Sequence, residues 1–208
     1  MSHAASIAAA AAGLPVDTMI SVLTAHDRPP TGPSRIGGPG VELGARHPTF
    51  VNGGRMTHIV TLATAEVPTL AEAYPDAAAV ALYVFEPRSN EAFEPFARDA
   101  AVVALSWEEL AGPPAASTRE DLPPRAVTVE HLAVPAAAFG DSEGAALEAV
   151  RAAIFAAPGR AGGAPIWVQA PQHTGTFLFQ FDEQLADLNL GDAGVMYVFV
   201  DTAFWQGH

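Results

Sequence analysis

The sequence predicts an α+β protein dominated by β-structure, in which two related antiparallel or mixed sheets arise from an internal duplication. Two echoes carry this prediction: Arg35-Ile-Gly-Gly38 returns as Arg160-Ala-Gly-Gly163, and the segment Ala79–Phe85 returns as Ala193–Phe199. Short apolar runs, rich in β-branched and aromatic residues, are separated by Gly- and Pro-rich connections. Half of the 208 residues are hydrophobic, which is enough to bury the core of one compact domain.

The first of the two halves is expected to span residues 16–111, after a short N-terminal helix. The Ala-rich segment Ser2–Ala12 favours that helix, and Gly13 and Pro15 stop it. Residues 28–40 carry four Pro and four Gly, so they are expected to form an irregular connection. The strands expected in this half are Met19–Leu23, His58–Ala63, Ala79–Phe85 and Ala100–Trp107.

A linker over residues 112–124, which contains four Pro, is expected to lead into the second half, residues 125–208. Asp141 or Ser142 is expected to cap a helix, and Phe204-Trp205 to be a tail held against the sheet. A turn is expected at Gly191-Asp192. The strands expected here are Ala126–Val134, Ile166–Gln169, Thr176–Asp182 and Val195–Val200.

The spacing of the two echoes is unequal. Arg35 and Arg160 are 125 positions apart whereas Tyr83 and Tyr197 are 114 apart, a difference of 11 that an insertion within residues 41–54 would explain. Chance is the alternative, because glycine pairs and Tyr-Val-Phe are common in strands and turns. We favour duplication.

The charge balance excludes several classes of partner. The chain has 23 acidic residues and 10 basic ones, all Arg, for a net charge of −13. Such a chain repels nucleic acid and anionic membranes, whereas a cationic protein would be attracted. Absence of Cys excludes disulfides and thiol chemistry. The Ala4–Ala12 segment lacks the basic residue that precedes a signal sequence, and no apolar run approaches ~20 residues, so a cytoplasmic protein is expected.

The histidines do not form a recognisable catalytic or metal motif. His26, Asp27 and His47 come nearest to one, but their spacing matches no metal-ligand pattern, and polar residues on a Pro-rich loop are the favoured interpretation. His58 and His131 fall in expected strands, where a hydrogen-bonded, half-buried histidine is the favoured interpretation.

Other catalytic and metal patterns are also incomplete. Ser142 lies in no nucleophile elbow, and the glycine pairs match neither phosphate-binding loop pattern. An acidic segment could supply oxygen ligands to Ca²⁺ or Mg²⁺, but its spacing is not that of a calcium loop and turn formation is favoured. Its residues are Asp182, Glu183, Asp187, Asn189 and Asp192. We therefore assign no catalytic residue, metal or cofactor.

The candidate ligand-binding residues lie in the second half. Trp167 beside Gln169 and Gln180 offers an aromatic face next to amides, although Trp167 could equally belong to the core. Arg160, like Arg35, could clamp a carboxylate or bridge to a local acid. The set is Arg160, Trp167, Gln169, Gln180 and Asp192. Because no catalytic constellation in the sequence is complete, we predict a non-catalytic binding or interaction module; the alternative is a hydrolase, metal-dependent in one version, that uses His26, Asp27 or His47 near the glycine-rich loops.

Five pieces of the chain resemble the YwqG-like family, a group of bacterial proteins that share a domain of unknown function. The pieces are Ser34–Gly38, Met56–Leu62, Gly162–Gln169, Phe177–Asp182 and Gly191–Phe199. The resemblance implies a β-rich fold with two related halves and a cytoplasmic setting, but no established reaction. Thr61 departs from the family pattern, which has Gln there, whereas Gln180 keeps it. A site is therefore expected on the second half or in the groove between the halves.

Overall fold

The computed structural model describes the chain except for residues 50–52, 85–99, 117–121, 191–192 and 208. Its strands form one sheet of ten, and every pairing between them is antiparallel. In spatial order they are β10 (Ala203–Gln206), β9 (Val195–Phe199), β8 (Phe177–Asp182), β7 (Gly159–Ala161), β1 (Thr18–His26), β6 (Arg125–Val134), β2 (Arg35–Ile36), β3 (Thr57–Ala63), β4 (Ala79–Val84) and β5 (Ala100–Leu105). The β-rich α+β class is thus confirmed, but the expectation of two separate sheets is wrong.

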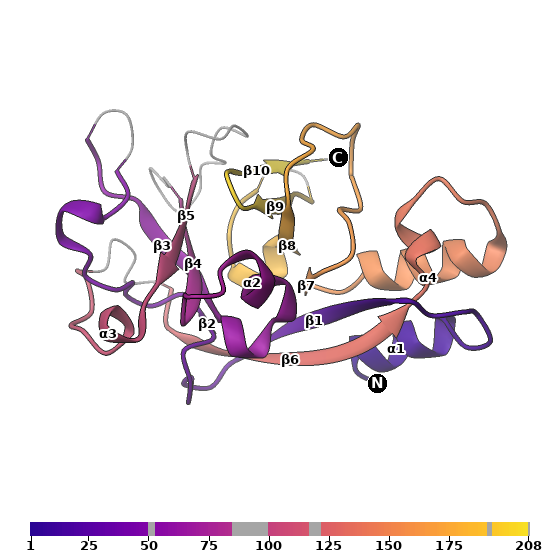
Figure 1. The fold of residues 1–208 in the computed structure, drawn as a ribbon, viewed down its shortest axis with the longest axis horizontal. Helices are drawn as coiled ribbons and strands as arrows, with labels where there is room; N and C mark the ends of the chain where they lie inside the picture. The colour runs from indigo at the N-terminus through magenta and orange to yellow at the C-terminus, as the bar shows by residue number, and fades with distance from the viewer. Residues whose placement is uncertain (50–52, 85–99, 117–121, 191–192, 208) are drawn as a thin grey trace.

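The long antiparallel pair β1–β6 joins two wings into this single sheet (Figure 1). We call β2–β5 the first wing and β7–β10 the second wing. β1 pairs with β7, and β6 pairs with β2, so each sequence half lends one strand to the wing of the other half. The outermost strands β5 and β10 approach each other, which makes the sheet nearly closed and barrel-like.

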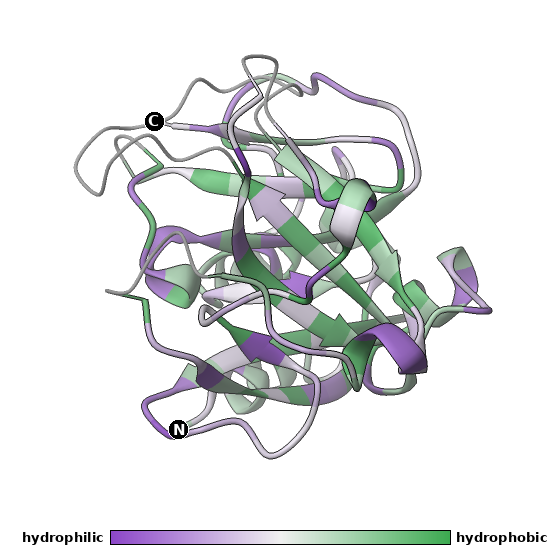
Figure 2. Ribbon diagram, turned by 90° about the vertical axis from the view of Figure 1, so that its left-hand side faces the viewer, coloured by the Kyte–Doolittle hydropathy of each residue, from purple (hydrophilic) through white to green (hydrophobic). Residues whose placement is uncertain are grey.

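The inside of this nearly closed sheet is filled by apolar side chains from both wings. Val60, Leu82, Phe179 and Met196 belong to one buried cluster, and Leu70 joins it from the helix between the wings. Figure 2 shows hydrophobic residues concentrated along the strands. Alternate residues of the same strands point outward and are covered mainly by irregular segments, so both faces of the sheet are buried at β3, β4, β8 and β9.

The helices are short and cover the margins of the sheet. They are α1 (His3–Ala10), α2 (Pro68–Ala73), α3 (Trp107–Leu110), α4 (Ala145–Phe155) and α5 (Glu183–Ala186), with 3-10 turns at η1 (Gly44–Arg46), η2 (Thr64–Glu66) and η3 (Ala136–Phe139). The expected N-terminal helix is confirmed as α1, whose N-cap Ser2 accepts a hydrogen bond from Ala5 N at 3.2 Å. Ile7 of α1 and Ile154 of α4 pack on Ile20 of β1. Among the described helices, none is long and apolar enough to cross a membrane.

The second expected helix is confirmed as α4, but its expected cap is wrong, and so is one expected strand. The helix expected to begin after Asp141 or Ser142 begins only after Gly144, and no side chain caps it. Residues 166–169 are not a strand. Their amides bond to side chains of the sheet beneath them, not to a neighbouring strand, so the segment lies across the sheet face.

Pairing within the first wing has a close counterpart in the second. Each wing has one irregularity in its strand pairing, at Ile59 in β3 and at Leu178 in β8. The carbonyl groups of these two residues accept from Gly37 N at 2.7 Å and from Gly162 N at 3.2 Å, respectively.

This register corrects the alignment that the sequence echo implies. In the first wing Arg35 pairs with Thr61, and Thr61 pairs with Ala81. In the second wing Arg160 pairs with Gln180, and Gln180 pairs with Tyr197. Tyr197 therefore corresponds in register to Ala81, while Tyr83 corresponds to Phe199. The two tyrosines still share the outward-facing side because they are shifted by two residues.

Candidate functional site

A segment of the second wing, residues 162–171, crosses the outer face of the sheet and forms one wall of the candidate site. It leaves β7 through Gly162, which has a φ of +81°. A Cβ atom there would lie 2.9 Å from the carbonyl oxygen of Met19 and 3.0 Å from Thr69 Oγ1. Only glycine fits this departure from the sheet without displacing β1.

Two predicted site residues, Arg160 and Gln180, hold this segment from beneath. Arg160 donates to Gly162 O at 2.8 Å, to Ala164 O at 2.6 Å and to Gln180 Oε1 at 2.7 Å. Gln180 Oε1 also accepts from Ile166 N at 3.0 Å. Both side chains therefore fix the path of the segment.

Arg160 is a fully buried cation that has no carboxylate partner among the described residues. Its guanidinium carbon lies 5.0 Å from the ring centre of Phe139 and 5.2 Å from that of Phe177. Burial lowers the pKa of Arg160 to about 9, so the group stays charged at neutral pH. Neutral oxygens and aromatic rings stabilise the charge of Arg160. Within the described residues, the sequence-based expectation of a bridge to a local acid is therefore not met.

Tyr197 anchors the next part of the segment and Trp167 lies on top of it. The Tyr197 hydroxyl donates to Ile166 O at 3.0 Å and accepts from Val168 N at 2.8 Å. Burial raises the pKa of Tyr197 to about 12, which keeps the phenol protonated. Trp167 stacks on Tyr197 at 4.8 Å, so one indole face is covered by the sheet and the other is directed away from it.

That outer indole face contributes to a hollow of about 430 Å³, which we call the second-wing hollow. Its lining residues are Phe139, Gly140, Asp141, Arg151, Pro165, Ile166, Trp167, Gln169 and Pro171. Gln169 is held by its own N–H, which donates to Gln206 Oε1 at 3.1 Å, and by its Nε2, which donates to Gly207 O at 2.7 Å. Its Oε1 atom is left as an acceptor.

The two charged residues of the hollow differ in availability. Arg151 donates to Ala138 O at 3.0 Å, to the carbonyl of Gly140 and to the carboxylate of Glu148. Asp141, in contrast, has no hydrogen bond or ion pair within the described part of the chain. The hollow therefore offers an aromatic face, an amide oxygen and a free carboxylate.

Four of the five predicted site residues thus lie on one side of the second wing. Trp167 and Gln169 line the hollow, Arg160 and Gln180 lie beneath its wall, and Asp192 falls outside the described residues. Sequence reasoning missed Phe139 and treated Asp141 only as a helix cap. Its position just before α4 carried no signal that it would face the segment around Trp167.

The histidines of the alternative, hydrolytic prediction are bound to separate partners. His26 Nε2 bonds to Thr128 Oγ1 at 2.8 Å, and Asp27 lies 3.7 Å from Arg125. His47 Nε2 bonds to Met56 O at 3.2 Å. The described residues include no group of three or more His, Asp or Glu side chains able to hold a metal ion.

The strand histidines are hydrogen-bonded. His58 Nδ1 bonds to Gly38 O at 3.1 Å and its Nε2 to Thr61 Oγ1 at 2.7 Å. Burial, reinforced by the charge of Arg35, lowers the pKa of His58 to about 4. His131 Nδ1 bonds to Ser21 Oγ at 3.0 Å, although the residue is exposed and not half-buried.

The acidic segment is used for local structure. Asp182 caps α5 by accepting from Gln184 N at 2.9 Å and Leu185 N at 3.1 Å, while burial raises its pKa. Asp187 ends α5 with a φ of 53°, which fits its predicted role as a turn former.

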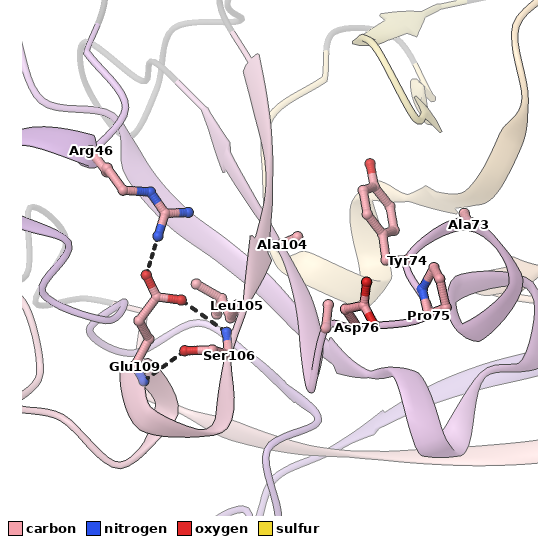
Figure 3. A pocket seen from close by; sticks show the side chains of 10 residues that line it. Arg46, Ala73, Tyr74, Pro75, Asp76, Ala104, Leu105, Ser106 and Glu109 are labelled. Atoms are coloured by element: carbon pink, nitrogen blue, oxygen red, sulfur yellow. Dashed lines mark hydrogen bonds and ion pairs between the residues drawn. The ribbon is translucent and has the colours of Figure 1, made fainter.

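Another hollow, separate from the second-wing hollow and about 380 Å³ in volume, lies beside the end of β5 (Figure 3). Arg46 pairs there with Glu109, which also accepts from Ser106 N at 2.8 Å and so completes the cap of α3. Tyr74 lines the same hollow and donates to Val200 O at 3.0 Å, a contact that ties the end of α2 to the second wing. Asp76 is the lining carboxylate without a bond in the described part of the chain.

Comparison with known protein families and with the curated proteins finds no match for this chain. The resemblance to the YwqG-like family therefore stays a prediction from the sequence pieces.

Proposed function

We propose that this protein is a non-catalytic binding module that takes a cationic group of a protein partner into the second-wing hollow. One observation carries the proposal. The outer face of Trp167, the free carboxylate of Asp141 and Gln169 Oε1 line the same hollow. An aromatic face next to a carboxylate attracts ammonium and guanidinium groups, through the ring quadrupole and through charge-assisted hydrogen bonds.

The surrounding charges support a cationic partner. Arg151 is the only basic residue in the hollow's described lining, and its guanidinium is already occupied by the carbonyls of Ala138, Gly140 and Ser142 and by Glu148. The chain as a whole carries a charge of −13, which speeds the approach of a positively charged protein and discourages nucleic acid.

A binding role fits the hollow better than catalysis. Its described lining contains one carboxylate and one guanidinium, with no serine or histidine beside them. Beneath the wall, Tyr197 is held protonated, and the two terminal nitrogens of Arg160 donate to three oxygens that fix the segment, while its Nε has no partner within the described residues. General acid–base work would need a titratable group within hydrogen-bond reach of a ligand and a suitable pKa.

We further propose that the two wings derive from one duplicated unit. The support is the shared strand order, the matching irregularities at Ile59 and Leu178, and the matching bonds from Gly37 and Gly162. The proposal does not depend on the Tyr-Val-Phe echo, which is out of register by two residues.

Titration with an Arg- and Lys-containing peptide tests the binding proposal, with a DNA oligonucleotide as the anionic comparison. We expect the peptide to bind and the oligonucleotide not to bind. Asp141→Asn or Trp167→Leu should weaken peptide binding by roughly tenfold, because each removes a charged or aromatic contact. Asp76→Asn, which removes an equal charge from the other hollow, is the matched control and should change affinity by less than about twofold.

Equal weakening by Asp141→Asn and Asp76→Asn would mean that the peptide responds to overall charge and not to the hollow. Absence of binding to any cationic peptide at low salt would overturn the proposed site altogether.

A further inference from the structure

The first wing contains a small cavity that plays no part in the proposed partner site. We call it the first-wing chamber, and only about 10 Å³ of it is open to the centre of a water molecule. Its walls are Gly38, Pro39, Gly40, His47, Met56, Thr57, His58, Tyr83, Ala115 and Ala116. This space has room for one water molecule and for nothing larger.

His47 lines the chamber and carries an unpaired buried acceptor. The residue is 91% buried, since its exposed fraction is 9%. Its Nε2 bonds to Met56 O at 3.2 Å, and because a carbonyl only accepts, Nε2 carries the proton of the neutral ring. His47 Nδ1 is then a buried acceptor, and it has no partner within the described residues.

Tyr83 presents an unused donor to the same chamber. Its hydroxyl accepts from Val41 N at 3.3 Å, but the described residues supply no acceptor for its proton. In the second wing, the Tyr197 hydroxyl has both partners from the backbone, Val168 N and Ile166 O. The first wing thus lacks the carbonyl that completes the hydrogen bonding of the second.

The other polar side chains around the chamber's walls are already paired or serve as structure. His58 uses both ring nitrogens, on Gly38 O and Thr61 Oγ1. Gly40 allows the close approach of Tyr83, because a Cβ atom at Gly40 would lie 2.7 Å from the Tyr83 hydroxyl. His47 and Tyr83 meet edge to face, with ring centres 5.3 Å apart.

We propose that the first-wing chamber is a binding site for a single water molecule, which donates to His47 Nδ1 and accepts the proton of the Tyr83 hydroxyl. The water stands where the second wing uses the carbonyl of Ile166. Through His47, this water joins the segment that follows Gly37-Gly38 to Tyr83 of β4. In the second wing, Tyr197 of β9 bonds directly to the segment that follows Gly162-Gly163. The water thus gives a donor to an unpaired buried acceptor and an acceptor to a hydroxyl proton that has none, and such bonds retain a water inside a protein.

A crystal structure of the full chain at a resolution that reveals ordered solvent is the direct test. We expect one water within hydrogen-bond distance of both His47 Nδ1 and Tyr83 Oη. An empty chamber in a map that reveals other buried waters would overturn the proposal, as would a direct His47–Tyr83 hydrogen bond.

Magnetic relaxation dispersion of water nuclei, which counts long-lived internal waters, provides a solution test. Tyr83→Phe should lower the count by one and raise the unfolding equilibrium constant roughly fivefold or more, because His47 Nδ1 loses its water-mediated hydrogen bond to Tyr83. Tyr197→Phe is the matched control and should leave the count unchanged, since its hydroxyl is paired with backbone. An unchanged count in Tyr83→Phe would contradict the proposal, and if that variant does not fold, the wild-type crystal map decides.

Discussion

Protonation of His58 should make the protein less stable in mild acid. The folded-state pKa of His58 is about 4, against an ordinary value of 6.5, chiefly because burial penalises the charged ring. The unfolded chain therefore binds the proton more readily. Stability from the neutral ring is fully present above about pH 6.5 and is lost progressively as the pH falls toward about 4.

The size of this loss follows from the pKa difference. A fall from 6.5 to about 4 corresponds to about 3 kcal/mol over the whole window, at about 1.4 kcal/mol for each pKa unit. Between about pH 7 and about pH 5, the linkage relation assigns about 2 kcal/mol of lost unfolding free energy to this one histidine. The residue is only 5% exposed, so solvent screening removes little of this effect.

His58→Gln isolates the effect. Glutamine does not titrate, and its amide can still donate toward Gly38 O. Urea denaturation followed by tryptophan fluorescence at about pH 7 and about pH 5 should show the wild type losing about 2 kcal/mol more than the variant. His131→Gln, which changes an exposed histidine on β6, tests whether loss of any histidine has the same consequence. If wild type and His58→Gln lose equal stability between the two pH values, the burial argument is refuted.

Two further paired substitutions test how the segments are held on the sheet. Gly13→Ala, at a φ of +84° in open space, should cost about 1 kcal/mol, whereas Gly162→Ala, at +81° but 2.9 Å from Met19 O, should cost at least about 2 kcal/mol in urea denaturation. An equal loss of unfolding free energy in the two variants would show that the close approach of Met19 O to Gly162 does not affect stability. Arg160→Met should cost about 3 kcal/mol and speed amide exchange over residues 162–168, because three oxygens lose their donor. Arg35→Met removes a single described hydrogen bond, to Pro39 O, and should therefore cost less stability. If Arg160→Met instead stabilised the protein, the desolvation cost of the guanidinium would outweigh its hydrogen bonds.

The sequence predicts the long strands well because local pattern and final environment agree there. Residues 79–84 form a continuous apolar, partly β-branched run, and both of their faces are buried in β4. β2 and β7 are only 2 and 3 residues long, so no periodicity can reveal them. Their place in the sheet is set by partners far along the chain, as is the joining of both wings through β1 and β6.

The segment around Trp167 shows why the site was only partly predictable. Ile166-Trp-Val-Gln169 has the composition of a strand, but it pairs with no strand, and its amides bond to the side chains of Gln180, Tyr197 and Gln206. Local propensity predicts the extended backbone and cannot distinguish a strand inside the sheet from a segment lying across it. The sequence pattern brought together four residues that do lie on one side of the second wing, but Arg160 and Gln180 support the wall and do not line the hollow.

One sheet position accounts for the different outer faces of the two wings. At the position of Gln180, the side chain is long enough to reach Ile166 N, and Arg160 reaches Ala164 O, so the crossing segment is held as far as Ile166. The first wing has Thr61 at the corresponding position, which is too short to reach the crossing segment and bonds instead to His58. His58 in turn holds only Gly38 O, close to the sheet. We infer that the longer anchors leave an open hollow in the second wing, while the shorter ones let the first wing close down to a chamber of about 10 Å³.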